Sequence, residues 1–142
     1  MLLLLSMALA QPCSAAGEVG SYRTWERLDL GPGELHTVCL RGEVDYRPVS
    51  SAHLFLHRQA LDEEGPDEER IDASLDDRGC ATVCVPPGRW RATAVNGSKC
   101  LMSHYREATT SLLVKADRPR TWYVRMPSDG WPQVTLMRAT DG

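Results

Sequence analysis

Three observations predict an all-β domain, a sandwich or barrel of about seven or eight short strands. First, apolar residues alternate with polar ones along several short runs, as they do in strands that bury one face. Second, sequences rich in Gly, Pro, Asn and Asp separate these runs at even spacing, and no segment sustains a helical period. Third, an even set of cysteines follows an export-like N-terminus, which is typical of a disulfide-stapled domain. The 142 residues suffice for one domain with a single core.

The N-terminus has the pattern of a secretory signal. Met1–Ala10 is an apolar run that is too short to span a bilayer. Small residues in Ser14-Ala15-Ala16 predict a signal peptide over residues 1–16, with the mature chain starting at Gly17. Ala8-Leu9-Ala10 offers a competing cleavage site after Ala10. No Lys or Arg precedes the apolar run, which leaves open a start further upstream.

Cleavage after Ala16 would remove Cys13 and leave four cysteines, Cys39, Cys80, Cys84 and Cys100. An even count behind an export signal predicts two disulfides in an oxidising compartment, either the periplasm or the exterior. Ala10-Gln11-Pro12 precedes Cys13 where a bacterial lipoprotein has Leu and two small residues, so no lipid anchor is expected.

The domain organisation follows from these segments. Residues 17–34 are a polar lead-in, 35–126 the β domain and 127–142 a tail with a possible last edge strand. Two loops are expected, an acidic one at Leu61–Arg70 and another at Asn96–Glu107. Strands are expected at 35–46, 52–57, 71–75, 80–85, 90–95, 108–116 and 121–126.

The stretch CATVCVPPGRWRATAV, Cys80–Val95, predicts a β-hairpin. Pro87 and Gly88 suit the two central positions of a type II turn, although a longer connection stays open because this turn is not the preferred one. Six apolar residues then form the core face, with Val85 opposite Trp90, Val83 opposite Ala92, and Ala81 opposite Ala94. Cys80 and Cys84 lie on the outer face.

Strand geometry limits the disulfide pairing. Cys80 and Cys84 lie about 13 Å apart along one strand, beyond the roughly 7 Å between Cα atoms that a disulfide allows. Cys80 lies beside Val95, close in sequence to Cys100, so a Cys80–Cys100 bond is predicted. Cys39–Cys84 is the remaining pair, and Cys39 falls on the more polar face of its strand.

No pattern indicates a catalytic, cofactor or metal site. His53 and His57 share one strand face but lie about 13 Å apart, so one ion cannot bridge them. Cys80 and Cys84 fail as a zinc pair for the same reason. A Cys-His hydrolase site could combine a cysteine with His36 or His104, but no local sequence signature supports one. Asp62–Glu69 is acidic but lacks the regularly spaced Asp residues of a calcium-binding loop. Asn96-Gly97-Ser98 is a glycosylation sequon only in a eukaryotic source; otherwise it is a turn sequence.

Aromatic residues near the C-terminus are the candidate partner-binding residues: Trp122, Tyr123 and Trp131. Trp122 and Tyr123 are adjacent in a strand, so they face opposite sides and one of them is expected in the core. The other, with Trp131, is a candidate anchor of the kind enriched in protein interfaces. The alternative is that the tail covers both.

Three stretches, CLRGEVDYRPVSSAHLFLHR, LDDRGCATVCVPPGRWRATAV and ATTSLLVKADRPRTWYVRM, resemble the carboxypeptidase-regulatory or transthyretin-like β-sandwich modules. They are also similar to small exported bacterial domains of unassigned function. The resemblance spans Leu35–Met126 and implies an immunoglobulin-like sandwich, with Trp90 in the inward aromatic position of the family and a non-catalytic role. The missing lipoprotein motif and the four-cysteine set depart from the family pattern.

The function expected from these features is a non-enzymatic exported module that binds or assembles proteins of the cell envelope. The alternative is a secreted or periplasmic inhibitor or immunity-type protein that blocks an enzyme with a loop, Leu61–Arg70 or Asn96–Glu107. An enzyme is the least favoured class. Lys and Arg number 16 against 19 Asp and Glu, a net charge of -3, so no nucleic-acid or anionic-membrane surface is expected. Neither a cofactor nor a membrane-spanning segment is expected in the mature chain.

Overall fold

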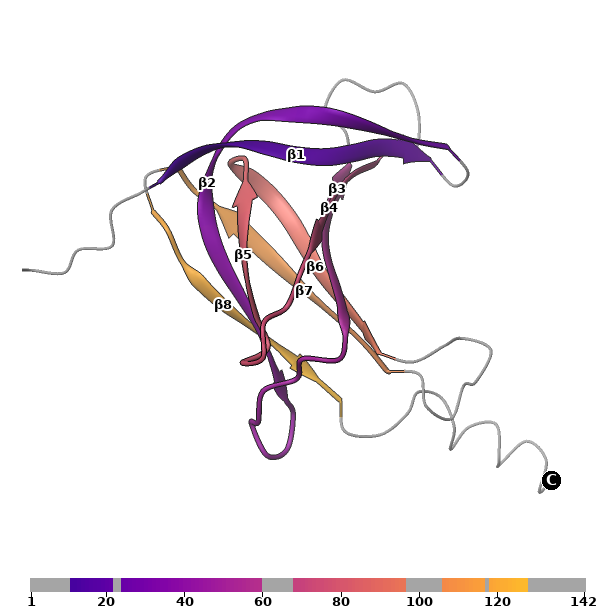
Figure 1. Cartoon of the computed structure of the whole chain (residues 1–142), viewed down its shortest axis with the longest axis vertical. Helices are drawn as coiled ribbons and strands as arrows, with labels where there is room; N and C mark the ends of the chain where they lie inside the picture. The colour runs from indigo at the N-terminus through magenta and orange to yellow at the C-terminus, as the bar shows by residue number, and fades with distance from the viewer. Residues whose placement is uncertain (1–10, 22–23, 60–67, 97–105, 117, 128–142) are drawn as a thin grey trace, which may run out of the picture.

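The computed structural model is all-β, as the sequence predicts (Figure 1). It describes residues 11–21, 24–59, 68–96, 106–116 and 118–127. Within these ranges there is no helix, and so none long and apolar enough to cross a membrane. The strands are β1 (Pro12–Ser21), β2 (Thr24–Gly42), β3 (His53–Gln59), β4 (Glu68–Ala73), β5 (Cys80–Val85), β6 (Gly88–Asn96), β7 (Arg106–Val114) and β8 (Thr121–Met126).

The strands form one curled sheet in the order β5-β2-β1-β4-β3-β6-β7, and β8 pairs in parallel with β2. β2 makes the curl possible because its first part pairs with β1 and its last part lies between β5 and β8. A β-bulge lies within the part of β2 that pairs with β1: Ala15 opposes Gly31 and Ala16 opposes Asp29, so Leu30 is the extra residue. Gly31 sits there at a φ of 101°, and such bulges bend a strand.

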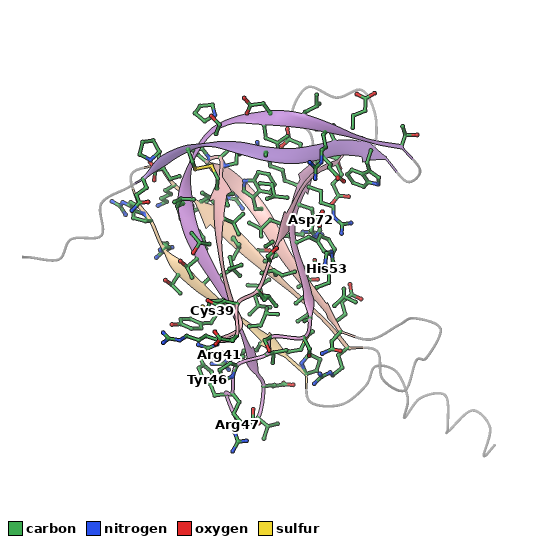
Figure 2. All side chains as sticks on the ribbon, viewed as in Figure 1. Cys39, Arg41, Tyr46, Arg47, His53 and Asp72 are labelled. Atoms are coloured by element: carbon green, nitrogen blue, oxygen red, sulfur yellow. A yellow bond between two sulfur atoms is a disulfide. The ribbon has the colours of Figure 1, made fainter. Side chains whose placement is uncertain are left out.

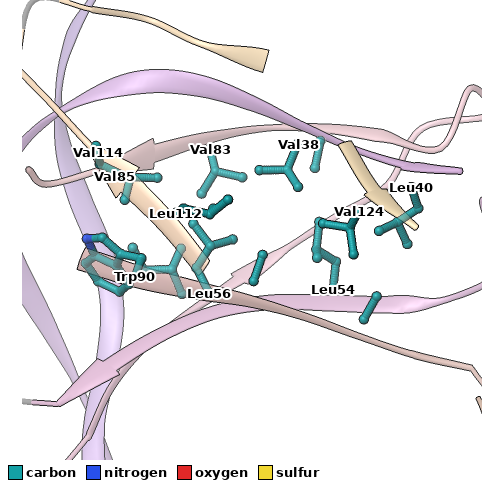
Figure 3. Close-up of a cluster of buried hydrophobic side chains, with 14 of the residues drawn as sticks. Val38, Leu40, Leu54, Leu56, Val83, Val85, Trp90, Leu112, Val114 and Val124 are labelled. Atoms are coloured by element: carbon teal, nitrogen blue, oxygen red, sulfur yellow. The ribbon is translucent and has the colours of Figure 1, made fainter. Parts of the chain in front are cut away.

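The core lies between the two layers of the curled sheet, where side chains of β2, β5 and β8 meet those of β3, β6 and β7 (Figure 3). Trp90 is the largest fully buried side chain, and its indole N–H donates to the Pro86 carbonyl at 2.9 Å. The Arg58 guanidinium lies 4.2 Å from the Trp90 ring centroid and forms an ion pair with Glu69. This largely buried pair therefore packs against the edge of the core at Trp90.

The predicted hairpin between the strands that became β5 and β6 is wrong. β5 pairs with β2, whereas β6 pairs with β3 and β7, so Pro86-Pro87 crosses from one layer to the other. The predicted core face is nevertheless confirmed, because all six of its residues are at most 6% exposed: Ala81, Val83, Val85, Trp90, Ala92 and Ala94. A period of two identifies the buried face of a strand but not its neighbour.

Other boundaries were confirmed or corrected in the same way. The strands expected near 52–57, 108–116 and 121–126 are present as β3, β7 and β8. The described part of the lead-in, residues 17–21 and 24–34, is instead strand, in β1 and β2. The strand expected at 35–46 ends at Gly42. The expected loops are shorter, because Glu68–Arg70 belongs to β4, Asn96 to β6, and Arg106 and Glu107 to β7. The remainder of both loops, and the tail beyond Pro127, lie outside the described residues.

Two disulfides form, but their pairing differs from the prediction. They are Cys13–Cys84 and Cys39–Cys80, with Cα separations of 6.0 and 4.0 Å. The predicted Cys80–Cys100 and Cys39–Cys84 bonds are therefore wrong. The β2–β5 register places Cys39 directly opposite Cys80, and β1 brings Cys13 alongside β2 next to Cys84. The exclusion of a Cys80–Cys84 bond is confirmed.

Candidate partner-binding surface

The outer face of the β2–β8 pair carries exposed aromatic and arginine side chains. The parallel register sets Cys39 beside Tyr123 and Arg41 beside Arg125. Leu40 and Val124 alternate with them and are fully buried. The same alternation turns Tyr123 outward, where 49% of it is exposed. Cys39, which lies beside Tyr123, forms a disulfide with Cys80 on the neighbouring strand β5. A covalent bond therefore joins β2 to β5 next to Tyr123.

Two arginine–tyrosine contacts organise this face, one between β2 and β8 and one between β8 and the loop that follows β2. The Arg41 guanidinium lies 5.6 Å from the Tyr123 ring centroid, and that of Arg125 lies 5.4 Å from the Tyr46 ring centroid. Arg41 also donates from Nη1 to the carbonyls of Leu40, at 3.0 Å, and Arg78, at 2.8 Å. These contacts hold long side chains in place at the surface. We call Arg41, Tyr46, Tyr123 and Arg125 the Tyr–Arg surface.

The loop from Gly42 to Arg47 presents Tyr46 in a fixed position. The Gly42 N–H donates to the Arg47 carbonyl at 2.8 Å, and the Tyr46 N–H donates to the Gly42 carbonyl at 3.1 Å. Tyr46 has a φ of 59°, a left-handed conformation that costs a non-glycine residue on the order of 1 kcal/mol. At the tip, Val44 is 80% exposed. Figure 2 shows Arg41, Tyr46 and Arg47 at one end of the molecule, away from His53 and Asp72.

A hollow of about 460 Å³ lies next to the Tyr–Arg surface, between β7 and β8. Tyr123 and Arg125 line it from β8, Thr109 lines it from β7, and Glu43 lines it from the loop. β7 and β8 each pair with a single strand among the described residues, so each presents a sheet edge toward this hollow. Such an edge can accept an extended segment by adding a strand.

The structure separates the three predicted partner-binding residues. Trp122 packs against the core, with its ring centroid 5.1 Å from that of His36, whereas Tyr123 faces solvent. Trp131 lies outside the described residues. Sequence reasoning missed Arg41 and Tyr46, and the signal for Tyr46 is the run of charged and aromatic residues after Gly42. The positive φ of Tyr46 leaves no trace in the sequence.

His53 and His57 make cross-strand contacts. His57 Nε2 lies 2.8 Å from the Thr93 hydroxyl, and its Nδ1 pairs with Glu68. His53 Nε2 lies 3.4 Å from an Asp72 carboxylate oxygen. Phe55 lies between the two imidazoles, under the Arg70 guanidinium. Across the described part of the chain, no three His, Cys, Asp or Glu side chains gather as a metal site would require.

His36 is buried beside Trp122. Its Nδ1 accepts the Arg120 N–H at 3.2 Å. Burial lowers the pKa of His36 below its usual 6.5, and the nearby Glu34 carboxylate opposes that shift in part. The imidazole is therefore neutral at pH 7. Each cysteine within the described ranges is disulfide-bonded, so none of them offers His36 a thiolate.

Comparison of the chain with family models, with curated proteins and with solved structures finds no match.

Proposed function

We propose that the chain is an exported, non-enzymatic module that binds a protein of the cell envelope through the Tyr–Arg surface. The observation that carries this proposal is Tyr123, half exposed on a rigid strand pair and contacted by Arg41. Tyrosine and arginine are, with tryptophan, the residues enriched at interface hot spots. Side chains that are held in place before binding lose less entropy when the partner arrives.

The exported location is supported by the disulfides. Two bonds are formed, and disulfides of this kind persist in oxidising compartments such as the periplasm or the exterior. The apolar run Met1–Ala10 supplies a candidate export signal.

Within the all-β class, we propose that the fold is a transthyretin-like sandwich. It is supported by the two-layered arrangement of the curled sheet and by Trp90, which is buried and directed inward. The Pro86-Pro87-Gly88 segment joins strands of opposite layers, a connection compatible with a sandwich. Modules of that family mostly bind or brace other proteins, which agrees with a non-catalytic role.

Position-specific photocrosslinking tests the proposed surface. A photoreactive amino acid replaces Tyr123 in the exporting cell, and a matched variant carries it at Leu113 on β7, which is 47% exposed. Equal exposure of the two positions controls for random collision. We expect a discrete adduct from position 123 that excess unlabelled protein competes away, and none from position 113.

Two results would count against the Tyr–Arg surface. The first is an identical set of adducts from both positions, and the second is the absence of any adduct from position 123. The inhibitor alternative predicts a soluble enzyme as the captured partner and loss of that enzyme's activity in the complex. Most of the two loops first considered for that role lies outside the described residues.

A further inference from the structure

The structure distinguishes the two candidate sites of leader cleavage. A cut after Ala16 would remove Pro12–Ala16, the first half of β1. That segment contains Cys13, which is bonded to Cys84, and Ala15, which is 1% exposed. Its loss would leave Cys84 without its partner and would uncover the part of β2 from Asp29 to Glu34.

The fold engages the chain from Gln11 onward. The Gln11 carbonyl accepts the Leu35 N–H at 3.1 Å, one residue beyond the last β1–β2 pair, Pro12 with Glu34. The side chain of Gln11 itself is exposed. Cleavage after Ala10, within the small-residue pattern Ala8-Leu9-Ala10, would therefore preserve every contact that β1 makes with the described residues.

We propose that the leader is removed between Ala10 and Gln11, and that Gln11 then cyclises to pyroglutamate. This inference rests on the exported location in the proposed function. Cleavage creates a free α-amine on Gln11, and that amine can attack the Cδ carbonyl of its own side chain. A C–N bond forms and closes a five-membered lactam, while the bond from Cδ to the amide nitrogen breaks. The amide nitrogen leaves as ammonia after taking a proton from the amine, and no atom changes oxidation state.

The geometry around Gln11 leaves this reaction free to proceed. Among the described contacts, the Gln11 carbonyl ties the residue to β2, and its exposed side chain can turn back onto the amine. The product has no primary amine and no positive charge at its N-terminus. The mature chain would therefore begin with a neutral ring next to the residue that pairs with Glu34, and it would resist aminopeptidases that require a free amine.

Mass spectrometry of the exported protein tests the inference, with the full chain produced in an exporting host. We expect an N-terminal peptide that begins at Gln11, lacks one ammonia and is linked through Cys13 to Cys84. The matched variant Gln11→Asn should be cut at the same bond yet keep a free amine, because closure onto its shorter side chain would require a strained four-membered ring.

Each result has one meaning. An exported protein that begins at Gly17 would overturn the inference and leave the proposed function standing. A start at Gln11 with the ammonia retained would overturn the cyclisation. A chain that keeps its leader and is not exported would overturn both the inference and the exported location. Equal amine reactivity of the wild type and Gln11→Asn would also exclude the ring.

Discussion

Replacing both cysteines of the Cys13–Cys84 bond with serine should destabilise the domain by several kcal/mol without changing its fold. The bond joins residues 71 positions apart, and it encloses the Cys39–Cys80 bond, whose cysteines are 41 positions apart. The two disulfides are therefore nested. In the unfolded chain, the inner bond shortens the loop that the outer bond closes.

The magnitude follows from the length of that loop. With Cys39–Cys80 intact, the shortest loop runs from Cys13 to Cys39 and from Cys80 to Cys84, about 30 residues, and chain entropy gives a loss of about 3.6 kcal/mol. When Cys39 and Cys80 are also serine, the loop is the full 71-residue separation, and the same relation gives about 4.4 kcal/mol. The outer bond should therefore be worth more when the inner bond is absent.

Urea unfolding followed by tryptophan fluorescence measures both values, since Trp90 is buried in the core. The four proteins needed are the wild type, each double-serine variant and the quadruple variant. A loss below about 1 kcal/mol on removing Cys13–Cys84 would refute the reasoning, because the entropy relation could not then describe the bond. If removing Cys13–Cys84 lowers the free energy of unfolding by less when Cys39–Cys80 is absent than when it is present, the nested arrangement is refuted.

Three further predictions concern the interior. Burial lowers the pKa of His36, so the unfolded chain takes up a proton as pH falls through 6.5 while the folded chain resists protonation. The urea midpoint should therefore fall when the pH is lowered from about 7.5 to about 5.5. The fall should be larger in the wild type than in His36→Gln. Gly79→Ala should lower the free energy of unfolding more than Gly31→Ala does. Both glycines have a positive φ, but only at Gly79 would the new Cβ meet backbone, at 2.7 Å from the Val49 carbonyl oxygen. Equal unfolding free energies of the two variants would contradict that close approach. Arg58→Met should lower the free energy of unfolding by about 3 kcal/mol, because it leaves the largely buried Glu69 carboxylate without its ion pair. Adding Glu69→Leu should recover part of that loss in a double-mutant cycle.

Much of the fold could be predicted from alternation alone. The side chains of β5 and β6 that face the core are those that a period of two selects, and β3, β7 and β8 lie where apolar and polar residues alternate. Alternation fixes a face but says nothing of the neighbouring strand. Val85 and Trp90 are therefore both in the core although their strands belong to different layers.

The N-terminal strands escaped prediction for a different reason. Described side chains from Thr24 to Asp29 are all exposed, so this part of β2 has no apolar face and no alternation to detect. Cleavage after Ala16 would remove Cys13, so the sequence pairs Cys80 with Cys100 by proximity and leaves Cys39 with Cys84. The true pairs depend on registers between strands far apart in the chain.

The candidate site was predicted only in part. Adjacent positions in a strand required Trp122 and Tyr123 to face opposite sides, and Tyr123 is the exposed residue. Arg41 and Tyr46 join it through the parallel β2–β8 register and the loop after Gly42. Neither a parallel pairing between distant strands nor a positive φ at Tyr46 can be deduced from composition or spacing.

A disulfide map of the exported protein under non-reducing conditions tests most directly whether β1 belongs to the folded domain. Proteolysis and mass spectrometry should recover Cys13 linked to Cys84 and Cys39 linked to Cys80. A map with Cys80 linked to Cys100 and Cys39 linked to Cys84, in a chain without Cys13, would contradict the fold, the nested disulfides and the cleavage at Gln11 together.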